Sequence, residues 1–128
     1  MTVLVTGGAG FIGSHLVDHL LTETDESIIV LDNFSTGSAA NLSHLETDRV
    51  ETVDGDIRDA SLVADLIADA DTVYHLAAAV GVKRIVENPL DSLRTNLEGT
   101  ENVLEAAAQD ATPTFIASSS EVYGKSEA

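Results

Sequence analysis

The chain has 128 residues, of which 44% are hydrophobic, so its length and composition suit a single folded domain. It contains no Cys, which excludes disulfides, cysteine-ligated zinc and thiol nucleophiles. Its formal net charge of −16 argues against binding to nucleic acids or anionic membranes. No apolar run approaches the ~20 residues of a membrane span, and no membrane partner is expected.

The acidic residues are dispersed along the chain, and Lys83 and Lys125 are the only lysines. Such a surface is typical of a halophilic protein, because a salt-rich cytosol screens self-repulsion. An ordinary acidic protein is the alternative. The residues after Met1 lack the basic start of a signal peptide, so a cytoplasmic location is expected.

Strand and helix patterns alternate along the chain. Strands are expected at residues 1–6, 27–32, 50–53, 72–76 and 114–117, and helices at residues 11–22, 39–45, 59–68 and 89–108. Asp59 suits a helix N-cap, and Pro89 suits a first helical turn. Right-handed crossovers then predict an α/β fold, a Rossmann-like doubly wound parallel sheet with strand order 3-2-1-4-5. We expect one domain over residues 1–128.

A glycine-rich turn joins the first strand to the first helix. Gly8, Gly10 and Gly13 fit the pattern Gly-x-Gly-x-x-Gly, and Gly7, Gly10 and Gly13 fit Gly-x-x-Gly-x-x-Gly. Such glycines let a dinucleotide's diphosphate approach the backbone at a helix N-terminus. A purely structural turn is the alternative, and the position between strand and helix favours binding.

Asp32 ends the second predicted strand, 19 residues after Gly13. An acid at about this spacing accepts hydrogen bonds from ribose hydroxyls in dinucleotide-binding domains. A carboxylate there repels a 2′-phosphate, and Asn33 follows it where an Arg would welcome that phosphate. The pattern therefore predicts NAD rather than NADP.

Six segments occur in the order and spacing of a known family: residues 6–13, 32–37, 55–59, 75–78, 95–100 and 118–124. The chain resembles the N-terminal part of the extended short-chain dehydrogenases/reductases. Within them it resembles the NAD-dependent nucleotide-sugar epimerases and dehydratases, such as UDP-glucose 4-epimerase and UDP-glucuronate decarboxylase. The resemblance implies hydride transfer between a sugar carbon and the nicotinamide, with a nucleotide sugar as substrate.

The resemblance also implies site residues. Asp56 would meet the adenine amine, Ile57 would pack on the ring, and Asn96 would stabilise the site. Ser119 would hydrogen-bond the substrate oxygen, and Glu121 matches an acid found in dehydratases and decarboxylases, which favours these reactions slightly over simple epimerisation. The implied cofactor-binding residues are Gly7, Gly10, Phe11, Ile12, Gly13, Asp32, Asn33, Ser35, Thr36, Gly37, Asp56, Ile57, Leu76, Ala77, Ala78, Asn96 and Ser118. No metal site is expected, because the four His show no ligand spacing.

Structural alternatives exist for several of these residues. Asp56 could cap a turn, and Ala77 and Ala78 could be small because helices pack there. Asn96 could bond the backbone inside its helix, and residues 118–120 could be a polar strand end. The presence of the glycine turn favours the binding interpretations, since ligands bind at the carboxyl ends of such strands.

The family's catalytic Tyr-x-x-x-Lys pair is missing from the sequence. Ala78 follows Tyr74 by four residues, and Glu127 follows Tyr123. We therefore expect a truncated chain that lacks the substrate domain and is catalytically incompetent alone. An uncovered sheet edge or helix face then predicts a homo-oligomer. Residues 80–88 are predicted as a loop close to the substrate.

Other functions remain open on the sequence. A stand-alone dinucleotide-binding module without enzymatic activity keeps the same fold. A Rossmann-like domain without a ligand is disfavoured by the glycine turn together with Asp32. A carbonyl or flavonol-type reductase of the same superfamily is disfavoured by Asp32, since those enzymes usually take NADP.

Overall fold

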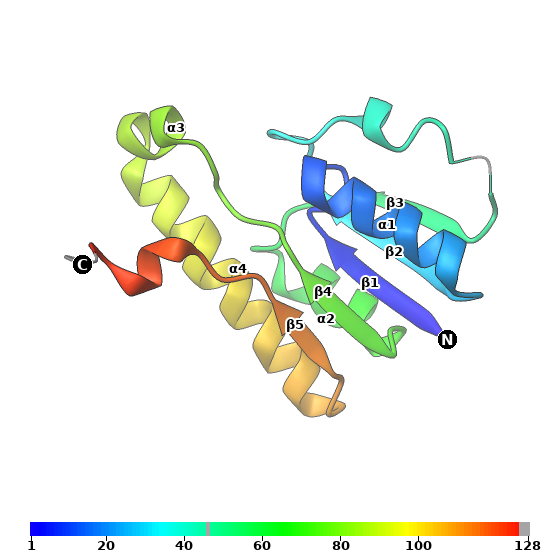
Figure 1. Ribbon diagram of the computed structural model, residues 1–128. Coiled ribbons are helices and arrows are strands. Elements are labelled where there is room, and N and C mark those ends of the chain that lie inside the picture. The colour runs from blue at the N-terminus through cyan, green and yellow to red at the C-terminus, as the bar shows by residue number, and fades with distance from the viewer. Residues whose placement is uncertain (46, 126–128) are drawn as a thin grey trace.

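A computed structural model describes residues 1–45 and 47–125, and the side chains of these residues apart from Ser120 and Glu121. Within this part of the chain, five strands form one parallel sheet in the order β3-β2-β1-β4-β5 (Figure 1). The predicted fold class and strand order are confirmed. The strands are β1 (Thr2–Thr6), β2 (Ser27–Asp32), β3 (Val50–Asp54), β4 (Thr72–His75) and β5 (Thr114–Ile116). The helices are α1 (Phe11–Glu23), α2 (Ala60–Ala68), α3 (Val82–Glu87) and α4 (Pro89–Gln109), with 3₁₀ turns at Ala39–Asn41 and Ser120–Tyr123.

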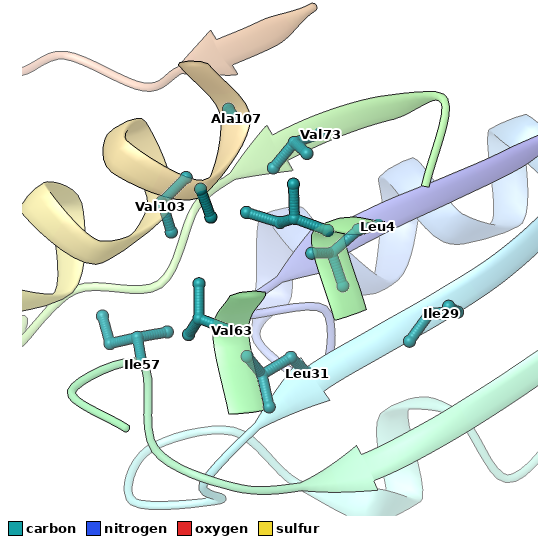
Figure 2. Close-up of a cluster of buried hydrophobic side chains, with 10 residues drawn as sticks. Leu4, Ile29, Leu31, Ile57, Val63, Val73, Val103 and Ala107 are labelled. Carbon is teal, nitrogen blue, oxygen red and sulfur yellow. The ribbon is translucent and has the colours of Figure 1, made fainter. Parts of the chain in front are cut away.

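The two faces of the sheet carry different helices. Successive residues of a strand point to opposite faces, so Leu4 of β1 lies on one side and Val3 and Val5 lie on the other. Leu4 packs with Val63 of α2 and Val103 of α4, as Figure 2 shows. Val3 and Val5 belong to a second cluster, which includes Val17, Leu20, Ile28 and Val30 and lies under α1.

The carboxyl ends of β1 and β4 therefore lie between α1 on one face and α4 on the other. Parallel strands that are covered on both faces are almost wholly apolar, and Val3, Leu4, Val5 and Val30 are at most 2% exposed. A ligand at the carboxyl ends of these strands can therefore contact residues from the helices on both faces of the sheet.

Two helix starts behave as the sequence predicts. Asp59 caps α2, and its side chain accepts a hydrogen bond from the Leu62 N–H at 3.1 Å. Pro89 occupies the first turn of α4, where its missing N–H has no helical partner to lose.

Two local predictions were wrong. The helix expected at residues 39–45 is only a 3₁₀ turn at Ala39–Asn41, capped by the Ser38 hydroxyl, which accepts from the Ala40 N–H at 3.2 Å. The loop expected at residues 80–88 contains helix α3, which Gly81 precedes with a φ of +98°. Among the described residues, no helix has both the length and the apolar character needed to cross a bilayer.

Candidate functional site

A cavity of about 310 Å³ opens at the carboxyl ends of β1, β2 and β4, beside the N-terminus of α1. This is the edge where doubly wound sheets bind their ligands. Most of the cofactor-binding residues expected from the sequence line it: Gly7, Gly10, Phe11, Ile12, Gly13, Asp32, Asn33, Ser35, Thr36, Gly37, Ile57, Leu76, Ala77 and Ala78. The structure thus brings together segments that are far apart in the chain. For example, the backbone N–H of Ala77 donates to the hydroxyl of Thr6, which lies beside the glycine turn and 71 positions away.

At two positions of the glycine turn, neighbouring backbone atoms leave no room for a side chain. Gly7 has a φ of +74°, and a Cβ on it would lie 2.8 Å from the backbone nitrogen of Ala77. A Cβ on Gly13 would collide with the carbonyl oxygen of Gly7. The turn is held by hydrogen bonds from the Gly7 N–H to the Leu31 carbonyl (2.8 Å) and from the Gly10 N–H to the Gly7 carbonyl (3.1 Å).

The N-terminus of α1 faces this cavity without a side-chain cap. Gly10 is the N-cap residue and makes no side-chain hydrogen bond to the helix. The first N–H groups of a helix lack intrahelical partners and carry a partial positive charge. Gly10, Phe11, Ile12 and Gly13 all line the cavity, so this helix end can hold an anionic group there.

Asp32 anchors the other side of the turn. Its side chain is buried, and its two carboxylate oxygens accept from different backbone groups: Oδ2 from the Ala9 N–H at 3.0 Å and Oδ1 from the Phe34 N–H at 2.8 Å. A carboxylate oxygen has two lone pairs, so each oxygen keeps one acceptor site. The aspartate therefore fixes the turn and still presents acceptors to a pair of ribose hydroxyls.

The segment after β2 is fastened to the glycine turn at Ala9. The Ala9 carbonyl accepts from the Ser38 N–H at 3.0 Å and from the Asn41 side-chain amide at 2.8 Å. A Cβ on Gly37 would lie 2.9 Å from the Ala9 carbonyl carbon, so Gly37 permits this close approach. The wall formed by residues 33–37 is thus held in place against the glycine turn.

A polar cluster of Thr6, His75 and Thr100 lies next to the cavity and holds the backbone that lines it. The Thr6 hydroxyl oxygen accepts from the N–H groups of Leu76 (3.2 Å) and Ala77 (3.1 Å). Its own hydrogen is therefore donated to His75 Nδ1, which lies 2.7 Å away. His75 must then carry its proton on Nε2, which donates to the Thr100 hydroxyl at 3.2 Å. Burial lowers the pKa of His75, in agreement with a neutral ring.

Asn96 supports the wall formed by residues 76–80. Its side-chain oxygen accepts a hydrogen bond from the Ala79 N–H at 2.7 Å. Asn96 does not itself line the cavity, whereas Ala79 does. The role expected for this asparagine, the stabilisation of the site, corresponds to a specific backbone contact.

Asp56 lies next to the cavity rather than in its lining, and it is engaged by Arg58. The Arg58 guanidinium donates to both Asp56 carboxylate oxygens at 2.8–3.2 Å, and its backbone N–H donates to Oδ1 at 2.9 Å. The hydrogen bond from Arg58 holds the pKa of Asp56 below its usual value and raises that of Arg58. Asp56 thus caps this turn, and its contact with the adenine amine stays a prediction, while Ile57 lines the cavity.

The implied cofactor-binding residue Ser118 and the implied catalytic residues Ser119 and Glu121 follow β5. Ser118 and Ser119 are exposed, and neither lines the cavity. The side chain of Glu121 lies outside the described residues.

The sequence did not single out six cavity residues: Leu31, Gly55, Ala79, Val80, Arg84 and Thr95. Gly55 and Thr95 begin two of the six matched segments, and Leu31 directly precedes a third, so the sequence motifs could have identified them. Arg84 has no local signal, because its place in the cavity depends on helix α3 and on a contact to Ser35, which is 49 residues away. In the part of the chain that the structure describes, no group of three or more His, Asp or Glu side chains is arranged to hold a metal ion.

Comparison with known proteins identifies the family. The family model described as GDP-mannose 4,6 dehydratase matches residues 4–128. The low-salt glycan biosynthesis protein Agl12 of Haloferax volcanii is 44% identical, over 98% of this chain and 41% of that protein. UDP-glucuronic acid decarboxylase 1 of Arabidopsis thaliana is 41% identical, over 97% of this chain and 27% of that protein.

Solved structures show the same fold. DesIV, a dTDP-glucose 4,6-dehydratase of Streptomyces venezuelae crystallised with NAD and TYD, superposes with a TM-score of 0.93 at 38% identity. The superposition covers 100% of this chain and 42% of DesIV. UDP-glucose 4-epimerase of Bifidobacterium longum, in complex with NAD⁺ and UDP, superposes with a TM-score of 0.87 at 31% identity, over 100% of this chain and 40% of that one.

The chain thus spans less than half the length of these relatives. The resemblance inferred from the six motifs is confirmed, and the chain belongs to the GDP-mannose 4,6 dehydratase family of nucleotide-sugar dehydratases and epimerases.

Proposed function

We propose that residues 1–128 form the NAD-binding part of a nucleotide-sugar epimerase, dehydratase or decarboxylase. The observation that carries this proposal is the convergence, in one cavity, of the uncapped α1 N-terminus and the doubly anchored Asp32 carboxylate. These two groups suit the two polar parts of a dinucleotide, its anionic diphosphate and its ribose diol. Relatives crystallised with NAD support the same choice of ligand.

Each wall of the cavity has a role in this proposal. The N–H groups at the start of α1 receive the diphosphate, and the free lone pairs of Asp32 accept from the adenosine ribose. Ile57, which is 6% exposed, provides an apolar surface for the adenine ring. Bound NAD would supply a hydride acceptor and donor, and the chain would bind and orient it.

Asp32 also disfavours NADP in this proposal. Both of its oxygens are held in place by backbone N–H groups, so the carboxylate cannot easily turn away from a 2′-phosphate. Repulsion between these two anions in a partly desolvated site would oppose NADP binding.

The proposed reaction rests on family membership. We propose that Ser119 hydrogen-bonds the substrate oxygen and that Glu121 acts on protons of the sugar, which favours a dehydratase or a decarboxylase. These 128 residues contain no Tyr-x-x-x-Lys pair, so on their own they are expected not to convert a nucleotide sugar. Turnover of a UDP- or dTDP-sugar by the purified 128-residue chain would contradict this. A dinucleotide-binding module without enzymatic activity is the alternative, and a longer natural chain with the missing pair would exclude it.

An apolar face suggests self-association. Leu90, Leu93, Leu97 and Leu104 of α4 are 46–67% exposed, and Phe115 of β5 is 55% exposed. Exposed apolar residues at helical spacing mark interaction surfaces. We propose a homo-oligomer through this face, and a monodisperse monomer by light scattering in molar KCl would contradict it.

The charge supports a proposal about the environment. The net charge of −16 and the similarity to a Haloferax protein favour a halophilic, cytoplasmic protein. Folding should then require molar KCl, since added salt screens the repulsion among the carboxylates. A thermal unfolding temperature that does not change between dilute buffer and molar KCl would contradict the halophilic interpretation.

Isothermal titration of NAD⁺ and NADP⁺ into the purified chain in molar KCl tests the proposed binding. We expect NAD⁺ to bind more tightly than NADP⁺. Asp32→Asn should weaken NAD⁺ by about 10- to 100-fold, because hydrogen bonds to a charged acceptor are lost. Asp54→Asn is the matched control, since Asp54 pairs with Asp32 across β2 and β3 but is exposed and outside the cavity. A folded wild-type chain that binds neither nucleotide would refute the proposal.

A further inference from the structure

We propose that Arg84 binds the diphosphate of the nucleotide, from the side of the cavity opposite the α1 N-terminus. This inference rests on the proposed function and adds a residue that the sequence motifs do not contain. Of the described residues that line the cavity, Arg84 alone has a basic side chain. In a chain with 22 acidic and six basic residues, a cation at this position is the main side-chain attraction for an anionic ligand.

The fold places Arg84 across the cavity from α1. Helix α1 covers one face of the sheet, whereas α3 packs against α4, which covers the other face (Figure 1). The nucleotide site lies at the sheet edge between these layers. A diphosphate held there by the N–H groups of α1 would therefore receive Arg84 from the second layer.

The guanidinium reaches the wall that follows β2. Arg84 Nη1 donates to the Ser35 hydroxyl at 3.0 Å, and Ser35 lies three residues after Asp32. The side chain is 29% exposed, so it is partly desolvated without being buried. It thus bridges two walls of the cavity, one formed by residues 33–37 and one formed by α3.

The positive charge of Arg84 is only weakly neutralised by its acidic neighbour. Its Nη2 lies 3.9 Å from Asp91 Oδ2, which is too long for a hydrogen bond. Asp91 also accepts from Arg58 Nη1 at the shorter distance of 3.0 Å. Asp91 is therefore shared between two cations and held more closely by Arg58.

A guanidinium has five N–H donors in a planar fork that matches phosphate oxygens. The hydrogen bond to Ser35 uses one of them, so Arg84 retains donors for a ligand. The alternative target is the 2′-phosphate of NADP. It is disfavoured because that phosphate would lie against the fixed carboxylate of Asp32.

The test compares ligands with and without phosphate. In Arg84→Gln and Arg84→Met, NAD⁺ affinity measured by isothermal titration should fall about 10-fold, the loss expected for one charge-assisted hydrogen bond. Adenosine, which has no phosphate, should bind the wild type and both variants equally, as measured by NMR titration. Arg84→Lys keeps the charge and should recover part of the NAD⁺ affinity. Lys83→Gln is the matched control, because it removes one charge from α3 at a side chain that is 87% exposed.

The outcomes separate this inference from the proposed function. Unchanged NAD⁺ affinity in Arg84→Gln, with a wild type that binds NAD⁺, would overturn the role of Arg84 alone. An equal loss of adenosine and NAD⁺ affinity would show that Arg84 acts by positioning Ser35, and would also overturn it. So would a wild-type preference for NADP⁺ that disappears in Arg84→Gln. A wild type that binds no NAD⁺ would overturn the proposed function, and this inference with it.

Discussion

Asn96 offers a quantitative test of how α4 supports the cavity. In the wild-type chain the Ala79 N–H donates to Asn96 Oδ1 at 2.7 Å, and Asn96→Ala removes this acceptor. Ala79 is 4% exposed, so water has little access to the abandoned N–H. A buried donor left without a partner costs about 1–3 kcal/mol. Alanine is the better helix former by about 0.5 kcal/mol, which offsets part of this cost.

The net expectation for Asn96→Ala is a loss of about 0.5–2.5 kcal/mol in the free energy of unfolding. At about 4 °C per kcal/mol for a domain of this size, the melting temperature should fall by about 2–10 °C. Chemical denaturation at fixed KCl measures the free energy directly. NAD⁺ affinity should also fall, because Ala79 lines the cavity.

Glu98→Ala is the control, since Glu98 is exposed on the same helix. It gains helix propensity without the loss of a buried bond, so it should leave stability within about 0.5 kcal/mol of the wild type. If Asn96→Ala is as stable as Glu98→Ala, the contact to Ala79 contributes nothing and the argument is refuted.

Two further predictions concern stability. Burial lowers the pKa of His75, so as the pH falls the unfolded chain takes up a proton on this residue before the folded chain does. The stability contributed by the neutral ring is therefore fully present above about pH 6.5, the usual pKa of His, and is lost as the pH falls below it. His75→Gln should abolish this dependence in denaturation measured from pH 7.5 to 5, whereas the exposed His44→Gln should retain it; the opposite pattern would contradict the assignment. Arg49 donates to the carbonyls of Leu21, Thr24 and Glu26, at the end of α1 and in the turn before β2. Arg49→Met should therefore cost about 2–4 kcal/mol in denaturant titrations. Arg94→Met, at an exposed position, should cost less than about 0.5 kcal/mol, and equal losses in the two variants would show that the carbonyl contacts are not responsible.

The sequence predicts the sheet and the glycine turn well because their signals are local. The strands are short apolar runs separated by helical stripes, and right-handed crossovers leave one strand order. Asp59 and Pro89 mark helix starts by their own chemistry. The spacing from Gly13 to Asp32 reflects the length of one helix and one strand, so it is also readable along the chain.

Contacts between distant segments are not readable in this way. Helix α3 has only six residues and follows a glycine with positive φ, which resembles a loop in sequence. Arg84 enters the cavity because α3 packs on α4 and its side chain reaches Ser35. Similarly, the sequence predicts that Asp56 meets the adenine amine, and only the structure shows that Arg58 also engages its carboxylate.

We propose that a dinucleotide binds at the carboxyl ends of β1, β2 and β4. The most direct measurement is an NMR titration of the ¹⁵N-labelled chain with NAD⁺ in molar KCl. We predict that the largest amide shifts occur in residues 7–13, 32–37 and 76–80, with a smaller effect at the side chain of Arg84. Shifts confined to the exposed face of α4, or no shifts in a folded chain, would contradict dinucleotide binding at this site.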